Sequence, residues 1–161
     1  MIDEKVFINE NYNPEIATPQ ELIEETIDNV EALLHKHVPD FIKFGPGRYT
    51  ISRGSTQVMI IVRPFTKDET AVEFISNVVA GANITEDLML FLLRKNSELH
   101  FGSFGLLFDN TIIFSHTLAG SYLDENELLA SLNSVAVIAD YYDDIIVDMA
   151  GGSRAIDIAT F

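Results

Sequence analysis

The stretch from Thr85 to Asn96 places the tightest limit on the fold, because its centre is apolar on every side. Its residues predict a short helix with Thr85 as the N-terminal cap and Leu88–Leu93 as an unbroken apolar run. A helix at a protein surface has one apolar stripe and one polar face, so a helix without a polar flank has to be covered all round. We expect the chain's own sheet to cover one side, which leaves open what covers the other.

Length and composition are those of one folded domain. The chain has 161 residues, of which 47% are hydrophobic, enough to bury a core and too apolar for a disordered chain. Leu88–Leu93 is far shorter than a membrane span. The first residues lack the basic and apolar regions of a secretory signal, so we expect a cytoplasmic protein. Because there is no cysteine, disulfides, thiolate metal sites and cysteine nucleophiles are excluded.

The chain is strongly acidic, with a formal net charge of −15 from 10 basic and 25 acidic residues. Binding to nucleic acid or to an anionic membrane requires clustered Lys and Arg, which here are few and scattered. We therefore expect neither nucleic acid nor membrane as a partner. A charge of this sign favours solubility and attracts basic partners.

The first strong helix signal begins at Thr18. Thr18 is expected to cap the helix, with Pro19 at its first position and Glu21 completing a capping box, and Pro39 is expected to end it. We interpret residues 1–17, which precede this signal, as an N-terminal arm.

Two strands follow the first helix and form a predicted hairpin. Tyr49–Arg53 and Thr56–Arg63 flank Gly54-Ser55, a pair that favours a two-residue type II′ loop. This loop sets the register and assigns one face of the hairpin to the core. The residues expected on the core face are Tyr49, Ile51, Val58, Ile60 and Val62, and those expected on the other face are Thr50, Ser52, Gln57, Met59 and Ile61. Met59 and Ile61 make the second face more apolar than open solvent requires.

The remaining elements follow from the same signals. Ala71–Ala80 alternates as a third strand, with Val72, Phe74, Ser76 and Val78 on one side. A second hairpin is predicted from Phe101–Phe108 and Thr111–Thr117 around a two-residue Asp109-Asn110 loop, which would place His116 opposite Ser103. A long helix, about 125 to 149, begins with an Asp124/Glu127 capping box and ends at Gly151-Gly152.

These elements predict an α+β fold in the order α-β-β-β-α-β-β-α. Strands joined by tight hairpins are antiparallel, and we expect the first and third helices on one face of the sheet. The predicted division of the chain is an arm over residues 1–17, a single domain over 18–152 and a C-terminal tail over 153–161.

Two groups of polar residues are candidate sites of chemistry. Asp140 and Asp144, four apart on one helical face with Asp148 one turn later, could ligate Mg²⁺. The long helix carries many acidic residues and no basic one, so a solvated face explains them more simply. The four histidines lack metal-ligand spacing, and no Ser-His-Asp or paired-carboxylate pattern is present. We expect no enzymatic activity, no cofactor and no resident metal.

The pattern resembles a known group of proteins. The residues that carry the likeness are Val78–Ala82, Leu92–Asn96, Phe101–Phe104 and Ala139–Asp144. With the element order, they resemble the YbjN-type family, which has a fold like that of type III secretion chaperones, and the likeness spans about residues 18–152. It implies a homodimer that holds an extended segment of another protein, with the second helix in the dimer interface. On this chain, the implied interface residues are Leu88, Leu90, Phe91 and Leu92.

The leading hypothesis is a non-enzymatic, homodimeric, chaperone-like protein that binds a client segment on the sheet face bearing Met59 and Ile61. One alternative is a regulatory or sensory module that binds a small ligand, for which Arg48, Arg53 and His116 are the few polar candidates. A second alternative is a metal-dependent enzyme built on Asp140 and Asp144.

Overall fold

The computed structural model describes residues 18–158, so the predicted arm over residues 1–17 and the last three residues lie outside the described part. The helices are α3 (Gln20–His37), α4 (Glu86–Glu98), α5 (Glu125–Ala150) and α6 (Ala155–Ile158). The strands are β1 (Ile42–Gly45), β2 (Arg48–Arg53), β3 (Thr56–Pro64), β4 (Thr70–Ala80), β5 (Ser103–Leu106), β6 (Ile112–Ala119) and β7 (Ser153–Arg154). The α+β class and the predicted order of the main elements are confirmed, and β1, β7 and α6 are additions that the sequence did not predict.

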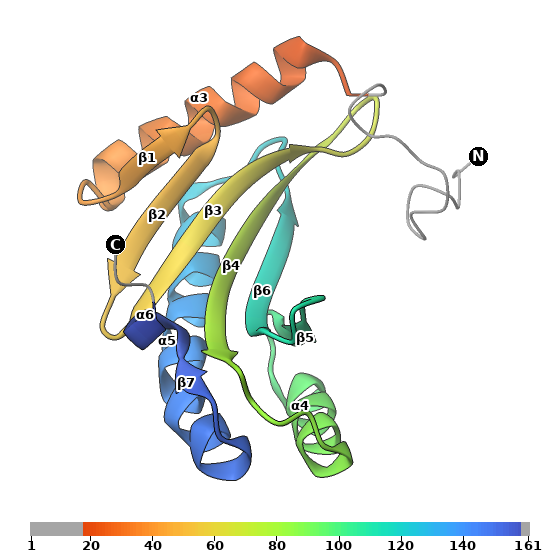
Figure 1. Ribbon diagram of the computed structural model, residues 1–161. Helices are drawn as coiled ribbons and strands as arrows, with labels where there is room; N and C mark the ends of the chain where they lie inside the picture. The colour runs from red at the N-terminus through yellow and green to blue at the C-terminus, as the bar shows by residue number, and fades with distance from the viewer. Residues whose placement is uncertain (1–17, 159–161) are drawn as a thin grey trace.

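All strands join one antiparallel sheet with the order β1-β2-β3-β4-β6-β5, and β7 pairs with β4. Helices α3 and α5 pack on the same face of this curved sheet, as expected (Figure 1). Among the helices of residues 18–158, only the short α6 lies on the opposite face, at one end, and α4 lies beyond the end of the sheet beside β5. Within residues 18–158, no helix is both long enough and apolar enough to cross a membrane.

The first hairpin has the predicted register. Arg53 pairs with Thr56 across the Gly54-Ser55 loop, and Ile51 pairs with Val58. The residues predicted on its core face are buried, except that Val62 is half-buried. The loop type and the alternation of side chains were therefore sufficient to fix this register.

The core lies between the sheet and the two long helices. From β4 the side chains of Val72 and Phe74 are fully buried, and they meet Leu34 of α3 and Leu128 of α5 in one apolar cluster. Fully burying a side chain of this size stabilises a fold by roughly 1.5–3 kcal/mol. Since α3 and α5 both pack on this face, the described part of the chain provides no helix of comparable length for the other face.

The caps of α4 and α5 are confirmed, and that of α3 is not. Thr85 accepts a hydrogen bond from the Leu88 N–H at 3.2 Å, and Asp124 and Glu127 form the predicted capping box. The predicted cap by Thr18 was wrong, because the N-cap of α3 is Pro19. The Thr18 hydroxyl is buried and instead accepts the Phe65 N–H at 2.8 Å, which ties the start of α3 to the end of β3.

The register predicted for the second hairpin was wrong by one residue, because the loop has three residues and not two. The Leu107 N–H donates to the Thr111 carbonyl at 3.0 Å, and Asn110 lies at a φ of 64°. A left-handed residue ending a three-residue loop is a common hairpin closure. Ser103 therefore pairs with Ser115, not His116. The shift places the rings of Phe104 and Phe114 opposite each other on the core side, with their centroids 5.0 Å apart.

Gly102, just before β5, has no room for a side chain. Its φ is 89°, and a Cβ atom would lie 2.6 Å from Cε1 of Phe114 and 2.8 Å from the Ser115 carbonyl oxygen. We predict that Gly102→Ala lowers the free energy of unfolding by about 2–4 kcal/mol, from the left-handed φ and the crowding together. Urea denaturation followed by circular dichroism measures the loss.

Gly105→Ala is the matched control for this prediction. A Cβ atom there would lie 3.3 Å from Cγ1 of Ile113, a side chain able to give way, so we expect a cost below about 1 kcal/mol. Equal unfolding midpoints for the two variants would contradict the packing described at Gly102.

Candidate functional site

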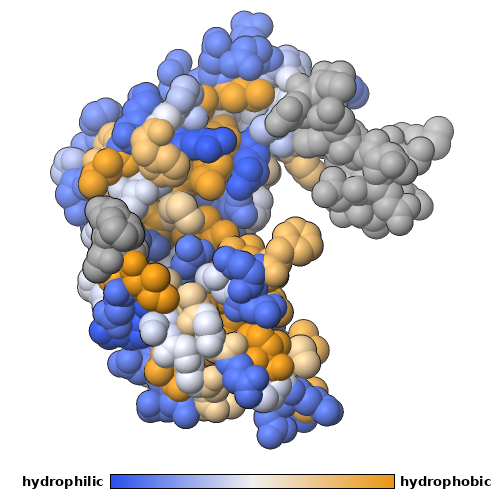
Figure 2. Space-filling model, viewed as in Figure 1, coloured by the Kyte–Doolittle hydropathy of each residue, from blue (hydrophilic) through white to orange (hydrophobic). Residues whose placement is uncertain are grey.

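The open face of the sheet carries a half-buried apolar centre. The register aligns Thr50, Met59, Ile75 and Ser115 in one row across four strands, and Arg48, Ile61, Glu73 and Thr117 in the next. Met59, Ile61 and Ile75 are all half-buried, although none of the long helices within residues 18–158 lies over them. Figure 2 shows apolar side chains across the middle of this face with hydrophilic groups around them. Aliphatic side chains on a pleated surface of this kind suit contact with another chain better than contact with water.

Polar groups border this centre. Arg63 donates from Nε to the Glu73 carboxylate at 2.6 Å, so these two charges neutralise each other. The other polar groups in the two rows are the Arg48 guanidinium and the hydroxyls of Thr50, Ser115 and Thr117, which can hydrogen-bond a peptide backbone.

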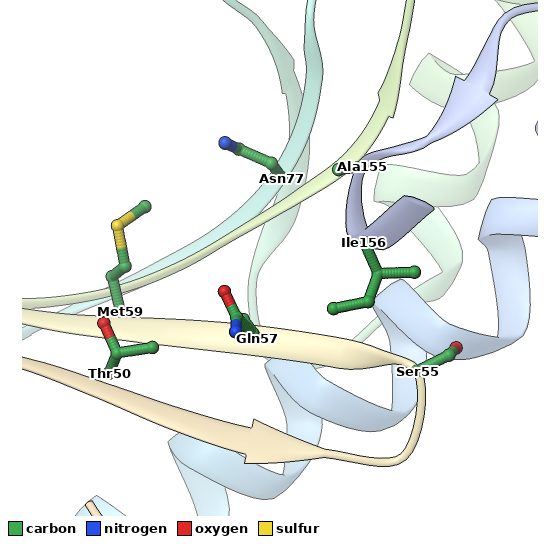
Figure 3. A pocket seen from close by; sticks show the side chains of 7 residues that line it. All are labelled: Thr50, Ser55, Gln57, Met59, Asn77, Ala155 and Ile156. Atoms are coloured by element: carbon green, nitrogen blue, oxygen red, sulfur yellow. The ribbon is translucent and has the colours of Figure 1, made fainter. Parts of the chain in front are cut away.

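Strands β3 and β4 part at one end of the open face and leave a pocket. Their ladder runs from the Pro64–Thr70 pair to the Met59–Ile75 pair, and beyond it β7 takes the edge of β4 that β3 has left. The pocket in this fork is lined by Thr50, Ser55, Gln57, Met59, Asn77, Ala155 and Ile156 (Figure 3). It lies between the predicted Met59 surface and the C-terminal segment, for which the sequence predicted no helix or strand.

The tip of the β2–β3 hairpin is fastened to α5 beside this pocket. The Ser55 N–H donates to Asp140 Oδ1 at 3.1 Å, the Ser55 hydroxyl also donates to that oxygen, and it lies 3.4 Å from Asp143 Oδ2. Asp143 is only 3% exposed, and burial is the main reason that its pKa is raised. The Ser55 hydroxyl has one proton, which it donates to Asp140, so the Asp143 carboxyl lies beside this hydroxyl and accepts the Asp144 N–H instead.

The predicted metal pair is divided between two different partners. Asp140 is engaged by Ser55, whereas Asp144 points outward with one carboxylate oxygen 3.8 Å from Nε of Arg154. Across residues 18–158, no three acidic, histidine or cysteine side chains come together as a cation site. In the structure, Asp140 fastens the hairpin and Asp144 faces the C-terminal segment.

The polar residues considered for a small-ligand site do not converge. Arg48 lies on the open face opposite Ile61, and Arg53 is paired with Asp40 at 2.9 Å. His116 lies on the other face of the sheet with the Phe101 ring 5.9 Å from its own, and burial lowers its pKa. These three groups form no common pocket.

Helix α4 divides its apolar residues between the chain itself and the surface. Leu88 is 1% exposed, and Phe91 packs its ring on Tyr142 of α5 with the centroids 6.2 Å apart. The exposed side chains are Met89 at 50%, Leu90 at 38% and Leu93 at 68%. Of the predicted interface residues, Leu90 therefore faces outward, Phe91 and Leu92 are half-buried, and Leu88 belongs to the chain's own core. The sequence did not single out Met89 or Leu93.

A side chain of α4 also fixes the orientation of that helix against β5. The Asn96 amide accepts the Phe104 N–H at 2.7 Å and donates to the Phe104 carbonyl at 3.2 Å, in the manner of a neighbouring strand. Leu88 and Leu92 line an apolar groove between α4 and β5 on this side. Leu93 also lines this groove while staying 68% exposed, whereas Leu90 does not line it.

Comparison with known proteins identifies the class to which this fold and surface belong. The chain belongs to the family TY-Chap1, described as T3SS (YopN, CesT) and YbjN peptide-binding chaperone 1, whose family model matches residues 19–158. This confirms the resemblance, and the match includes the C-terminal segment through α6.

Two solved structures share the fold at very low sequence identity. A chain in the crystal structure of the ExsC–ExsE complex aligns with a TM-score of 0.55 and 10% identity, covering 80% of this chain and 96% of that one. A chain in the structure of the HopA1–SchA chaperone–effector complex aligns with a TM-score of 0.51 and 8% identity, covering 89% of this chain and 99% of that one. No protein with a curated description matches this sequence.

The buried Asp143 predicts a pH-dependent effect on stability. Because its pKa in the folded chain lies above the unfolded value of about 3.9, the folded state holds this proton more tightly, and ionisation as the pH rises costs stability. We predict that Asp143→Asn melts at a higher temperature than the unmodified chain at pH 7, and that the difference shrinks toward zero below about pH 4. Calorimetry across this pH range measures both values.

Asp148→Asn removes one negative charge from an exposed position on the same helix and serves as the control. If it raises the melting temperature as much as Asp143→Asn at neutral pH, the gain comes from net charge and not from the buried carboxyl.

Proposed function

We propose that this protein is a chaperone that binds an extended segment of another protein on the open face of its sheet, with Met59 and Ile61 in the contact. The observation that carries the proposal is the half-buried apolar centre, which neither α3 nor α5 covers. Membership of a peptide-binding chaperone family supports the same function. In the two structural neighbours the related chain stands in a complex, ExsC–ExsE in one and SchA–HopA1 in the other.

An extended segment suits this face for a geometric reason. Successive side chains of a strand point to opposite sides, so a peptide lying on the face could set alternate apolar residues against the rows of Met59 and Ile61. The sheet also ends in two edge strands, β1 and β5, where backbone groups are available for one more strand. Ile42 on β1 and Leu106 on β5 are exposed at 65% and 48%, which adds apolar contact at both edges.

Charge favours basic clients. The net charge of −15 attracts positively charged segments and speeds their encounter with the chain. Asp140 and Asp144 carry this charge close to the pocket at the β3–β4 fork, because Ser55 lines that pocket and is bonded to Asp140. A client with Lys or Arg beside aliphatic residues would match both features.

We further propose that two copies of the chain associate through the outer side of α4. Leu90 and Leu93 are exposed there, and Leu106, Leu107 and Phe108 extend the apolar surface onto the neighbouring hairpin. Contiguous apolar surface of this kind is typical of protein–protein contacts. A second copy packed on this surface would remove from water the exposed apolar side chains at the centre of α4.

The client surface is tested with peptides selected from a random phage-displayed library. We predict that Ile61→Ser weakens binding of the selected peptides by about tenfold or more, because part of an aliphatic contact worth about 1.5–3 kcal/mol is lost. Fluorescence anisotropy with labelled peptides measures the dissociation constants.

Val137→Ser makes a similar change at a position of α5 that is 66% exposed and should leave peptide affinity unchanged. The proposal for this face would be overturned if the library yields no binder at low salt. It would also be overturned if the selected peptides bind Ile61→Ser as tightly as they bind the unmodified chain.

The α4 contact is tested by its own matched pair. We predict that the unmodified chain sediments as a dimer and that Leu93→Asp sediments as a folded monomer, because a charge buried in an apolar contact is strongly unfavourable. Val137→Asp, at a nearly equal exposure of 66% against 68%, should remain dimeric. Sedimentation equilibrium that gives one monomer mass for the unmodified chain would end this proposal.

A further inference from the structure

The C-terminal segment Ser153–Ile158 lies on the surface proposed for clients. After α5 ends at Ala150, the chain reverses through Gly151-Gly152, and β7 pairs Ser153 with Ala80 and Arg154 with Val79. α6 then lies over the end of the open face (Figure 1). The chain thus places a short stretch of itself where β3 and β4 part.

This placement is specific. A Cβ atom at Gly152 would lie 2.5 Å from the Ala80 carbonyl oxygen and 2.6 Å from the Ala82 nitrogen, so only glycine permits so close an approach of the two backbones. In Figure 3 the side chain of Ile156 projects into the opening toward Gln57. The segment therefore places an aliphatic residue in the pocket.

The segment is held by few contacts. β7 has two residue pairs with β4, and α6 is a helix of four residues, which has no stability of its own. Arg154 pairs with Asp157 inside the segment at 2.8 Å and, at the longer distance of 3.8 Å, with Asp144 of α5. None of the segment's residues belongs to the buried core. It could leave the sheet at little cost to the rest of the fold.

The charges of the segment match its surroundings. Arg154 Nε lies 2.8 Å from Asp157 and 3.8 Å from Asp144 of α5, and both carboxylates raise the pKa of the guanidinium, Asp157 the more. A basic residue is thus placed at the acidic end of α5, two positions before the aliphatic residue that enters the pocket. When no client is bound, the proposed client surface therefore holds a basic residue two positions before an aliphatic one.

We propose that Ser153–Ile158 is a built-in occupant of the client surface that an incoming client segment has to displace. The client then carries the same chemistry, a Lys or Arg two positions before an aliphatic residue. This inference rests on the proposed peptide-binding function and adds regulation and sequence preference to it. The binding-competent state is the one with the segment released, so apparent affinity falls with the fraction of molecules in which it is bound.

Two full-length variants shift this balance in opposite directions. Ile156→Ser removes the aliphatic anchor and should release the segment. The double variant Ala80→Cys/Ser153→Cys should hold it in place, because directly paired antiparallel residues lie within disulfide distance and the chain has no other cysteine. Its reduced form, the single cysteine variants and Val137→Ser are the controls.

The probe is a labelled peptide selected from a random phage-displayed library by the Ile156→Ser chain. We expect Ile156→Ser to bind it about tenfold or more tightly than the unmodified chain, and the oxidised double variant to bind it more weakly than either. Reduction of the double variant should restore the affinity of the unmodified chain. The selected sequences should be enriched in a basic residue two positions before an aliphatic one.

The possible failures are distinct. Equal affinity of all three forms for the peptide overturns the occupant while leaving the peptide-binding function intact. A selection that yields no binder for either the unmodified chain or Ile156→Ser overturns the proposed function and the occupant with it.

Discussion

The structure depends on a sheet whose two long helices, α3 and α5, both cover the same face. β4 runs through the middle of the sheet, and its Val72 and Phe74 are buried against α3 and α5 together. Once both long helices are used there, the opposite face keeps its aliphatic side chains half-buried at most. A fold with a helix on each face would have hidden them. The placement of both long helices on one face therefore leaves open the surface that we propose for client binding.

Two structural details join that surface to the rest of the chain. Ser55, at the tip of the β2–β3 hairpin, is bonded to Asp140 and contacts the buried Asp143, so the hairpin and α5 hold their relative positions. The end of α5 then delivers the C-terminal segment onto the open face beside the same tip. The acidic stretch of α5 that resembled a metal site in the sequence has two structural tasks: one carboxylate fastens a hairpin, and the next one along the outer face meets Arg154.

Local signals predicted much of this fold, and they failed where the outcome depended on distant parts of the chain. The Gly54-Ser55 loop and the alternation around it predicted the first hairpin and marked Met59 and Ile61 as residues on a second, unexpectedly apolar face. The Asp109-Asn110 pair is compatible with loops of two or three residues, and the packing of Phe104 on Phe114 selects the longer one. Thr18 was expected to cap a helix, but its hydroxyl bonds a strand far along the sequence. The pocket residues from β4 and α6 were missed because strand order and the return of the C-terminal segment leave no local pattern.

The sequence by itself determined the class of fold, the pairing of the first hairpin, the caps of α4 and α5, and the presence of an apolar helix without a polar flank. These features arise from residues a few positions apart, whose spacing and turn chemistry act alone. Only the tertiary structure decided which side of α4 stays exposed. That side follows from the burial of Leu88, the contact of Phe91 with α5 and the hydrogen bonds of Asn96 to β5. It also decided that the open face is partly occupied by the chain's own C-terminal segment. Both outcomes depend on contacts between segments far apart in the sequence, and the strength of such contacts is set by burial rather than by neighbouring residues.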